Sequence, residues 1–216
     1  MSPFAKKLPF KFSELHGALV LLLFHTVGLV GMSSPYARYF VQLTPFNLIL
    51  SLLVLLAFHP KYDTRFWVFA IITIGVGIGV EWIGVHTGML FGTYYYTNVF
   101  GYRLDGIPLL IGVNWLMLTI ICAELASKIL KKQSLRIIIG ALLMVALDVL
   151  IEPVAIRYGF WVWEANHVPW TNYFTWFIVA LPLQFLYQWS RSGNNLMAKW
   201  LFISQVLFFV GLLIKH

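Results

Sequence analysis

Seven long apolar segments, separated by short polar connections, constrain this chain more than any other feature. They lie at about residues 14–32, 46–59, 66–85, 107–130, 134–152, 173–190 and 196–214. Of the 216 residues, 60% are hydrophobic and only 11% are charged, whereas a water-soluble domain carries about a quarter charged residues. About 20 apolar residues cross a bilayer as a helix. We therefore predict an all-α, polytopic membrane protein with about seven transmembrane helices, in which residues 1–216 form a single integral membrane domain.

The lysines and arginines divide unevenly between the two sides that seven spans define. If the N terminus is inside, the inner residues are Lys6, Lys7, Lys11, Lys61, Arg65, Lys128, Lys131, Lys132, Arg136, Arg191 and Lys199. The outer ones are Arg38, Arg103, Arg157 and Lys215. Cytoplasmic connections are enriched in Lys and Arg, so we expect a cytoplasmic N terminus and a location in the cell membrane. The net charge of +7 does not predict nucleic-acid binding, because the basic residues are not gathered on one face.

Several kinds of site are excluded or disfavoured. Cys122 is the only cysteine, which excludes a disulfide framework and a cysteine-ligated metal site. A retinal Schiff base needs a lysine in the middle of the last helix, but Lys199 and Lys215 lie at the two ends of that segment. The glycines of segment 75–79 lie within a span, where they favour close helix contact over nucleotide binding.

Acidic residues occur within the apolar segments, where a charged group costs several kcal/mol by most estimates. Glu124 has a structural explanation, because Lys128 follows one helical turn later and is placed to pair with it. The other intramembrane acids, described next, lie near the outer ends of their helices and have no such partner.

Three acids and one asparagine are predicted at the same depth, in the outer part of the bilayer. Glu81 lies near the outer end of its helix, and Asn114 lies about two turns below the outer end of the next. Asp148 and Glu152 are four residues apart on one helix face, and we expect Pro153 to stop that helix. The arrangement predicts a single polar site formed by distant parts of the chain.

The alternative is that each acid lies at a wet interface, hydrogen-bonded or paired with Arg103 or Arg157. These arginines belong to the two longest connections, at about 86–106 and 153–172, which are both outer and rich in aromatic residues. Connections of this length also form pocket rims. Aromatic side chains there are typical of an interfacial belt: Tyr94, Tyr95, Tyr96, Trp161, Trp163 and Trp170.

Motifs around the predicted polar site resemble those of a known family. They are Glu81-Trp82-Ile83-Gly84-Val85-His86-Thr87-Gly88-Met89-Leu90-Phe91-Gly92-Thr93-Tyr94-Tyr95-Tyr96, Gly106-Ile107-Pro108 through Asn114-Trp115, Asp148 through Glu152-Pro153-Val154-Ala155, Trp161-Val162-Trp163 and Pro169-Trp170-Thr171-Asn172-Tyr173. In this order they resemble the membrane-integral carotenoid hydratases, the family of gamma-carotene 1'-hydroxylase and bisanhydrobacterioruberin hydratase. The resemblance covers about residues 75–180.

The resemblance implies addition of water across the terminal 1,2 double bond of an acyclic carotenoid end group, giving a tertiary alcohol. The expected partners are the carotenoid polyene, water and membrane lipid, and the chemistry requires no redox cofactor. Glu81 and His86 do not form a zinc-type His-Glu-His pattern, so no metal is predicted. The sequence predicts no oligomeric state.

For this chemistry we predict that Asp148 and Glu152 are an acid pair, one protonated and one ionised near neutral pH. One of them is the expected general acid, while Glu81 or the partner acid orients or deprotonates the water. Asn114 completes the predicted catalytic group. The predicted substrate-binding residues are Trp82, His86, Tyr94, Trp115, Trp163 and Asn172, of which Trp82, Tyr94 and Trp115 are expected to stabilise a carbocation through their ring faces.

Two other functions fit the same sequence. A lycopene-type cyclase starts from the same protonated end group but excludes water, so that ring closure follows. A non-catalytic carotenoid- or lipid-binding membrane protein would need the apolar groove but no acid. A transporter is disfavoured, because no internal repeat is evident.

Overall fold

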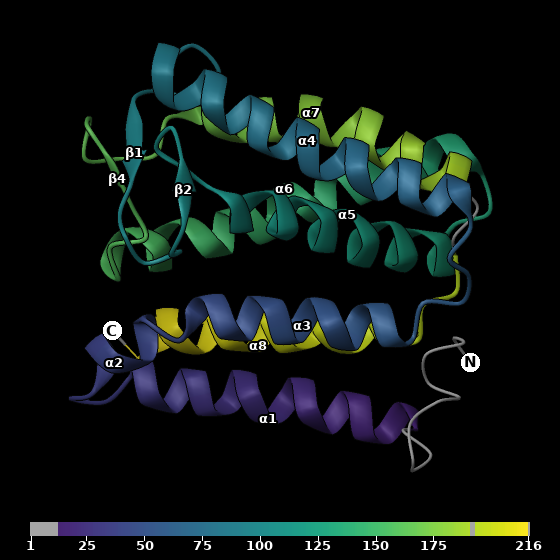
Figure 1. The fold of residues 1–216 in the computed structure, drawn as a ribbon, viewed down its shortest axis with the longest axis horizontal. Coiled ribbons are helices and arrows are strands. Elements are labelled where there is room, and N and C mark those ends of the chain that lie inside the picture. Colours follow the sequence, from purple (N-terminus) through teal and green to yellow (C-terminus); the bar gives the residue numbers. More distant parts are fainter. Residues whose placement is uncertain (1–12, 191–192, 216) are drawn as a thin grey trace.

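The computed structural model describes residues 13–190 and 193–215, which form eight α-helices and four short β-strands (Figure 1). The helices are α1 (Glu14–Met32), α2 (Ala37–Val41), α3 (Thr44–Ala57), α4 (Thr64–Thr87), α5 (Leu109–Ile129), α6 (Gln133–Arg157), α7 (Trp170–Ser190) and α8 (Ala198–Ile214). The strands are β1 (Tyr94–Tyr96), β2 (Arg103–Leu104), β3 (Ile107–Pro108) and β4 (Trp161–Trp163). The predicted helical architecture is confirmed, and the seven longer helices overlap the seven apolar segments. The strands are additions to an expectation of helices alone.

Four helices are long and apolar enough to cross a membrane, namely α1, α4, α5 and α6. Helices α3 and α8 are also apolar but have only 14 and 17 residues. Helix α7 has 21 residues and a lower hydropathy than the first four. This set of apolar helices is typical of a membrane protein.

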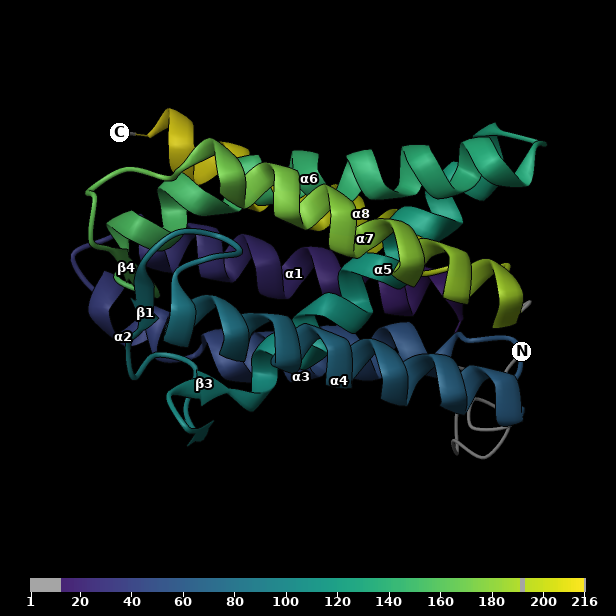
Figure 2. The same ribbon diagram turned by 90° about the horizontal axis from the view of Figure 1, so that it is seen from above.

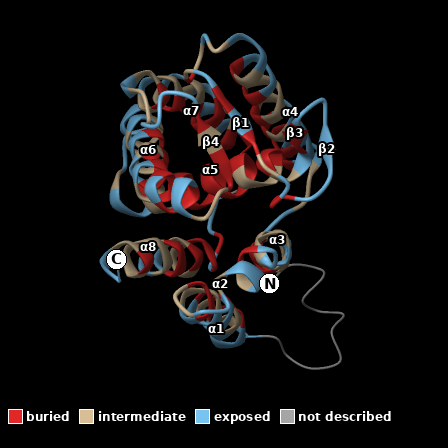
Figure 3. Cartoon of the chain, turned by 90° about the vertical axis from the view of Figure 1, so that its left-hand side faces the viewer, coloured by how far each residue is buried: buried red, intermediate tan, exposed pale blue. Residues whose placement is uncertain are grey.

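The helices form two groups that meet along α5. Viewed end-on, α4, α5, α6 and α7 form one group, and α1, α3 and α8 lie on the other side of α5 (Figure 3). Helix α5 contacts α3, α4, α6, α7 and α8, and 13 of its 21 residues are buried. Helix α5 is buried on all sides between Trp115 and Glu124 and is therefore the common core of the molecule.

Glycine allows α4 to approach α5 closely at one position. A Cβ atom on Gly77 would lie 2.8 Å from the Trp115 side chain, whereas one on Gly75 or Gly79 would meet nothing within 4 Å. The prediction that these glycines serve close helix contact thus holds for Gly77 alone, because the other two lie on different faces of the helix.

The expectation that Pro153 stops its helix is wrong, since α6 continues to Arg157. A proline removes one backbone donor from a helix, but Val154 and Ala155 of the following turn are fully inaccessible. Burial of these two side chains offsets the single missing hydrogen bond. Glu152 consequently lies inside the helix instead of at its end.

The two longest connections fold into two small antiparallel pairs at one end of the molecule (Figures 1 and 2). Strand β2 pairs with β3 in a tight turn, and β1 pairs with β4, with Tyr94 opposite Trp163 and Tyr96 opposite Trp161. Side chains alternate along a strand, so these four aromatic rings share one face and are buried. The interfacial-belt interpretation is wrong for them.

Candidate functional site

Glu81 is held by three neutral donors in the interior of the protein. It lies on the buried face of α4, one turn beyond Gly77. Its Oε2 accepts hydrogen bonds from the hydroxyls of Tyr94 and Tyr96, the latter at 2.7 Å, and its Oε1 accepts one from Trp115 Nε1 at 3.1 Å. The carboxyl group is fixed by two residues of β1 and one of α5.

Asp148 and Glu152 lie side by side on the buried face of α6. Asn172 of α7 donates from Nδ2 to Asp148 Oδ2 at 2.7 Å and to Glu152 Oε1 at 3.5 Å, so one amide joins the two acids. Glu152 Oε2 also accepts from the Nε1 groups of Trp161 and Trp163, both at 3.0 Å. Among the described residues, every donor to this pair is an uncharged side chain.

The β1–β4 pair delivers most of these donors. Tyr94 and Tyr96 of β1 contact Glu81, while Trp161 and Trp163 of β4 contact Glu152. The alternation of side chains in each strand places two donors on the inner face and one residue outside. A six-residue ribbon therefore positions the acids of two different helices.

Burial keeps both phenols of β1 protonated. It raises the pKa of Tyr94 and that of Tyr96 well above the ordinary value of 10, and the Glu81 carboxylate beside them raises both pKa values further. Each hydroxyl thus remains a hydrogen-bond donor to Glu81 throughout the neutral range.

The three acids line one small cavity of about 30 Å³. Its walls are Glu81, Phe91, Tyr94, Tyr96, Ile111, Asn114, Asp148, Ile151, Glu152, Trp161, Trp163, Asn172 and Trp176. A cavity of this size with several polar partners can hold an ordered water molecule. The predicted convergence of Glu81, Asn114, Asp148 and Glu152 is therefore present in the fold.

No cation neutralises this group within the described part of the chain. Arg103 donates to the backbone oxygen of Tyr96 at 3.0 Å, and Arg157 donates to that of Leu212 at 2.8 Å. The alternative in which these arginines pair with the acids is thus wrong. Residues 13–190 and 193–215 also contain no cluster of three or more His, Cys, Asp or Glu side chains that could hold a metal ion.

Glu124 is a separate buried acid. It lies toward the C-terminal end of α5, whereas Asn114 and Trp115 of the acidic site lie near the N-terminal end of that helix. It accepts hydrogen bonds from the Tyr187 hydroxyl and, at 3.0 Å, from the backbone N–H of Asn194. The expected ion pair with Lys128 is not among those that the described residues form, so that prediction is wrong.

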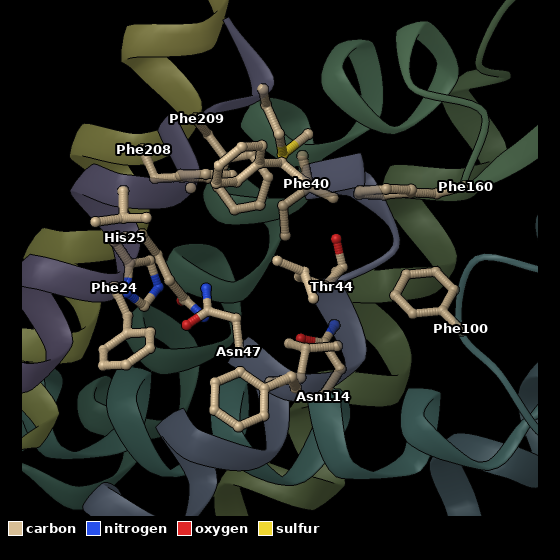
Figure 4. A pocket seen from close by; sticks show the side chains of 18 of the residues that line it. Phe24, His25, Phe40, Thr44, Asn47, Phe100, Asn114, Phe160, Phe208 and Phe209 are labelled. Atoms are coloured by element: carbon tan, nitrogen blue, oxygen red, sulfur yellow. The ribbon is translucent and has the colours of Figure 1, made fainter. Parts of the chain in front are cut away.

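A second, larger cavity adjoins the acidic one. It has a volume of about 390 Å³ and lies between α1, α3 and α8 on one side and α5 and α6 on the other (Figure 4). Its lining is predominantly apolar and includes Phe24, Phe40, Phe160, Phe208 and Phe209. Four residues line both cavities: Ile111, Asn114, Ile151 and Trp161. These four shared residues thus form the wall between an apolar chamber and the acidic cavity.

Two predicted substrate-binding residues lie outside this group. Trp82 and His86 stack on one another with ring centroids 4.7 Å apart, and both contact Asp105 in the β2–β3 turn. Neither lines a cavity described above. Successive residues of a helix point about 100° apart. Because Glu81 faces the interior, the next residue, Trp82, faces outward.

The remaining predicted residues are brought together. Tyr94, Trp163 and Asn172 line the acidic cavity, and Trp115 lies directly behind it, stacked on Trp176 at a centroid distance of 4.0 Å. Tyr96, Trp161 and Trp176 also belong to the site but were not predicted as site residues. For the first two, the period-two patterns Tyr-x-Tyr and Trp-x-Trp were a signal of paired strands.

Comparisons with known proteins identify a family and one curated relative. A family model described as carotenoid biosynthesis protein matches residues 43–214. A curated relative, bisanhydrobacterioruberin hydratase from Haloarcula japonica, is 27% identical over 190 residues, which cover 81% of this chain and 62% of that protein. The chain therefore spans less than two thirds of that relative's length. No solved structure matches the chain.

Proposed function

The chain belongs to the carotenoid biosynthesis protein family, and on that premise we propose that it is a carotenoid 1,2-hydratase. The substrate is a polyene with an acyclic end group, and the product is a tertiary alcohol. The observation that carries this proposal is that two cavities are neighbours and share four lining residues: one is apolar and about 390 Å³ in volume, and the other is small and lined by three acids. An end group lying in the first would present its terminal double bond to the second.

Proton transfer begins the reaction. One carboxyl of the Asp148–Glu152 pair donates its proton to C2 of the double bond, and the π electrons form the new C–H bond. Positive charge then develops at C1, which is tertiary. Sharing one proton between two adjacent carboxyls is favoured over two negative charges, and the uncharged donors around the pair do not supply a counter-charge.

Water addition completes the reaction. The oxygen of a water held in the acidic cavity forms the bond to C1, and its surplus proton passes to Glu81 or to the ionised acid of the pair. Asn114 and Asn172, which line that cavity, orient the water. One carotenoid and one water give one alcohol, and no electrons are transferred to a cofactor.

Aromatic faces stabilise the intermediate cation. Tyr94, Trp161, Trp163 and Trp176 line the acidic cavity, and a cation over such a ring gains about 2 kcal/mol or more when it is desolvated. The hydrogen-bond donors of Tyr94, Trp161 and Trp163 are directed to the acids, so these residues would contact the substrate through their rings.

We further propose that all seven longer helices span the cell membrane, with the N terminus in the cytoplasm. The distribution of Lys and Arg supports this orientation. In this orientation the acidic cavity and the strands would lie near the outer surface of the membrane. A polyene longer than the large cavity would extend between the helices into the lipid.

The test is expression in a host that accumulates acyclic carotenoids, followed by mass analysis of the pigments. Hydration adds the mass of one water, cyclisation leaves the mass unchanged but alters the chromatographic retention, and a non-catalytic binding protein alters neither.

Two conservative variants then test the acid pair. We expect Asp148→Asn and Glu152→Gln each to abolish hydration while the protein still inserts and accumulates. Glu124→Gln is the matched control, since Glu124 is equally buried but lies outside both cavities. Normal hydration by both site variants would refute the general-acid assignment.

A further inference from the structure

The large cavity opens to the outside of the protein between α1 and the start of α3. Most of its described lining residues are buried or half-buried, and those of α5, α6 and α8 include no exposed residue. A residue that lines a cavity and is also exposed lies at the rim of an opening. Four described residues have both properties, and we call the opening that they surround the mouth of the cavity: Phe24 (37% exposed), Val27 (47%), Leu43 (54%) and Phe46 (56%).

Close contacts at two glycines of α1 mark the two ends of this mouth. A Cβ atom on Gly17 would lie 2.8 Å from the ring of Phe58, which follows α3, and a Cβ atom on Gly31 would overlap the ring of Phe40 in α2. Helix α1 therefore lies directly against its neighbours at these two positions. Gly17 and Gly31 are about 21 Å apart along the helix, at a rise of 1.5 Å per residue. The exposed lining residues of α1 lie between them.

Along the same stretch, α1 is packed more closely against α8 than against α3. A Cβ atom on Gly28 would lie 3.2 Å from the Phe208 ring of α8, so glycine brings these two helices together. Toward α3 the contact is between two large side chains, Phe24 and Phe46, whose ring centroids are 5.9 Å apart. Exposed side chains change rotamer within nanoseconds. The two phenylalanines are therefore the part of the rim that can move aside.

The chemistry of the mouth suits an apolar, unsaturated chain. The described residues that line the cavity include no Asp, Glu, Lys or Arg, and the four exposed rim residues are all apolar. Exposed apolar patches mark binding grooves and contacts with membranes. With the helices in the bilayer as proposed above, the mouth faces lipid instead of water. In Figure 4 Phe24 lies across the cavity from Phe100 and Phe160, so aromatic rings are present at the mouth and on the far side.

We propose that the mouth between α1 and α3 is the site through which the carotenoid enters from the lipid. The acyclic end group lies in the cavity, against the wall that is shared with the acidic cavity. The rest of the polyene passes between Phe24 and Phe46 into the bilayer, so that a molecule much longer than the cavity is bound by one end. The inference rests on the proposed function, because it specifies the path of the substrate to the same site.

The experiment bridges the mouth with a reducible crosslinker in the Phe24→Cys/Phe46→Cys protein. The native Cys122 is buried and is kept. We expect a bifunctional methanethiosulfonate to abolish hydration of an acyclic carotene, and reduction of the bridge to restore it. Hydration by the bridged protein at the rate of the reduced protein would overturn the proposal, and the mouth would then hold only a lipid acyl chain.

Leu29→Cys/Gly211→Cys is the matched control for the bridge. A Cβ atom on Gly211 would lie 2.8 Å from the Leu29 side chain, so this pair joins α1 to α8, and neither residue lines the cavity. The same crosslinker should therefore leave hydration unchanged. Equal loss of hydration in both bridged proteins would mean that any restraint on α1 inactivates the protein, and would also overturn the proposal.

A single substitution tests the mouth without a crosslinker. Val27 and Val30 are both exposed valines of α1, but Val27 lines the cavity and Val30 does not. Val27→Trp narrows the mouth and should lower kcat/KM for the carotene, whereas Val30→Trp should leave kcat/KM unchanged. Equal kcat/KM values for the two variants would contradict the proposal.

Trapping of the pigment separates this inference from the hydratase assignment. Protein that is loaded with the carotene before bridging should retain the pigment through size-exclusion chromatography in detergent, whereas protein that is bridged first should take up none. If no alcohol forms but the order of addition decides retention, the mouth stands and the hydratase assignment fails. If alcohol forms at equal rates with and without the bridge, the hydratase assignment stands and the mouth fails. If no alcohol forms and the order makes no difference, both fail.

Discussion

Asn172→Leu tests whether the amide that joins the two acids supports catalysis. Leucine is close to asparagine in size but has no hydrogen-bonding group, so the change removes the donor 2.7 Å from Asp148 and 3.5 Å from Glu152. A hydrogen bond to a charged group contributes about 1.5–3 kcal/mol, and the longer contact is at the limit of hydrogen-bond geometry. Counting the short bond alone, and with each 1.36 kcal/mol corresponding to a factor of ten, we expect kcat to fall about 10- to 150-fold.

The assay is the initial rate of alcohol formation per amount of folded protein, with the folded fraction measured by size-exclusion chromatography in detergent. Asn195→Leu is the matched control, because Asn195 is also buried and donates one hydrogen bond, at 2.8 Å to the backbone oxygen of Leu55. That variant should lower the yield of folded protein and leave kcat unchanged. An Asn172→Leu protein with wild-type kcat would show that the bridging amide has no part in the reaction, and would refute the reasoning from this contact.

Two further predictions concern stability. Gly77→Ala should lower the free energy of unfolding by about 1–3 kcal/mol, as overpacking does, because the new Cβ would lie 2.8 Å from the Trp115 side chain. Gly75→Ala is the control and should not destabilise the protein, because its new Cβ would meet nothing within 4 Å. The two variants are compared by thermal unfolding in detergent. Burial raises the pKa values of Tyr94 and Tyr96 above the ordinary value of 10, so above pH 10 the unfolded chain loses phenol protons that the folded chain keeps. Stability should therefore fall as pH rises through 10, and the fall should be shallower in the Tyr94→Phe/Tyr96→Phe protein; equal slopes would contradict the prediction.

The two acid-to-amide variants given above examine the same site by an independent readout. They act on the proton, whereas Asn172→Leu acts on the position of the acids.

The sequence alone was sufficient to predict the helical segments. Apolar side chains favour burial in lipid or protein wherever they occur, so a run of about 20 of them specifies a helix without reference to its neighbours. A charged carboxyl within such a run is energetically unfavourable in the membrane. The positions of Glu81, Asp148 and Glu152 in the sequence were therefore enough to identify them as unusual.

Partners within a helix were also predictable where spacing decides them. Asp148 and Glu152 share a face because they are four residues apart. The same argument failed for Glu124, since Lys128 has the right spacing but Tyr187 and Asn194 supply the hydrogen bonds. In that case donors from other parts of the chain were better placed than the neighbour on the helix.

Only the tertiary structure decided what surrounds the acids. Four of the donors to Glu81 and Glu152 come from two strands 65 or more residues apart in sequence. The pairing of these strands depends on how α4, α6 and α7 bring the two connections together. The large cavity depends in the same way on α1, α3 and α8, whose sequences show only that they are apolar. Hydrophobicity is a property of each segment by itself, whereas a cavity and a bridging hydrogen bond are properties of segments in contact, and contacts between distant segments are set by packing.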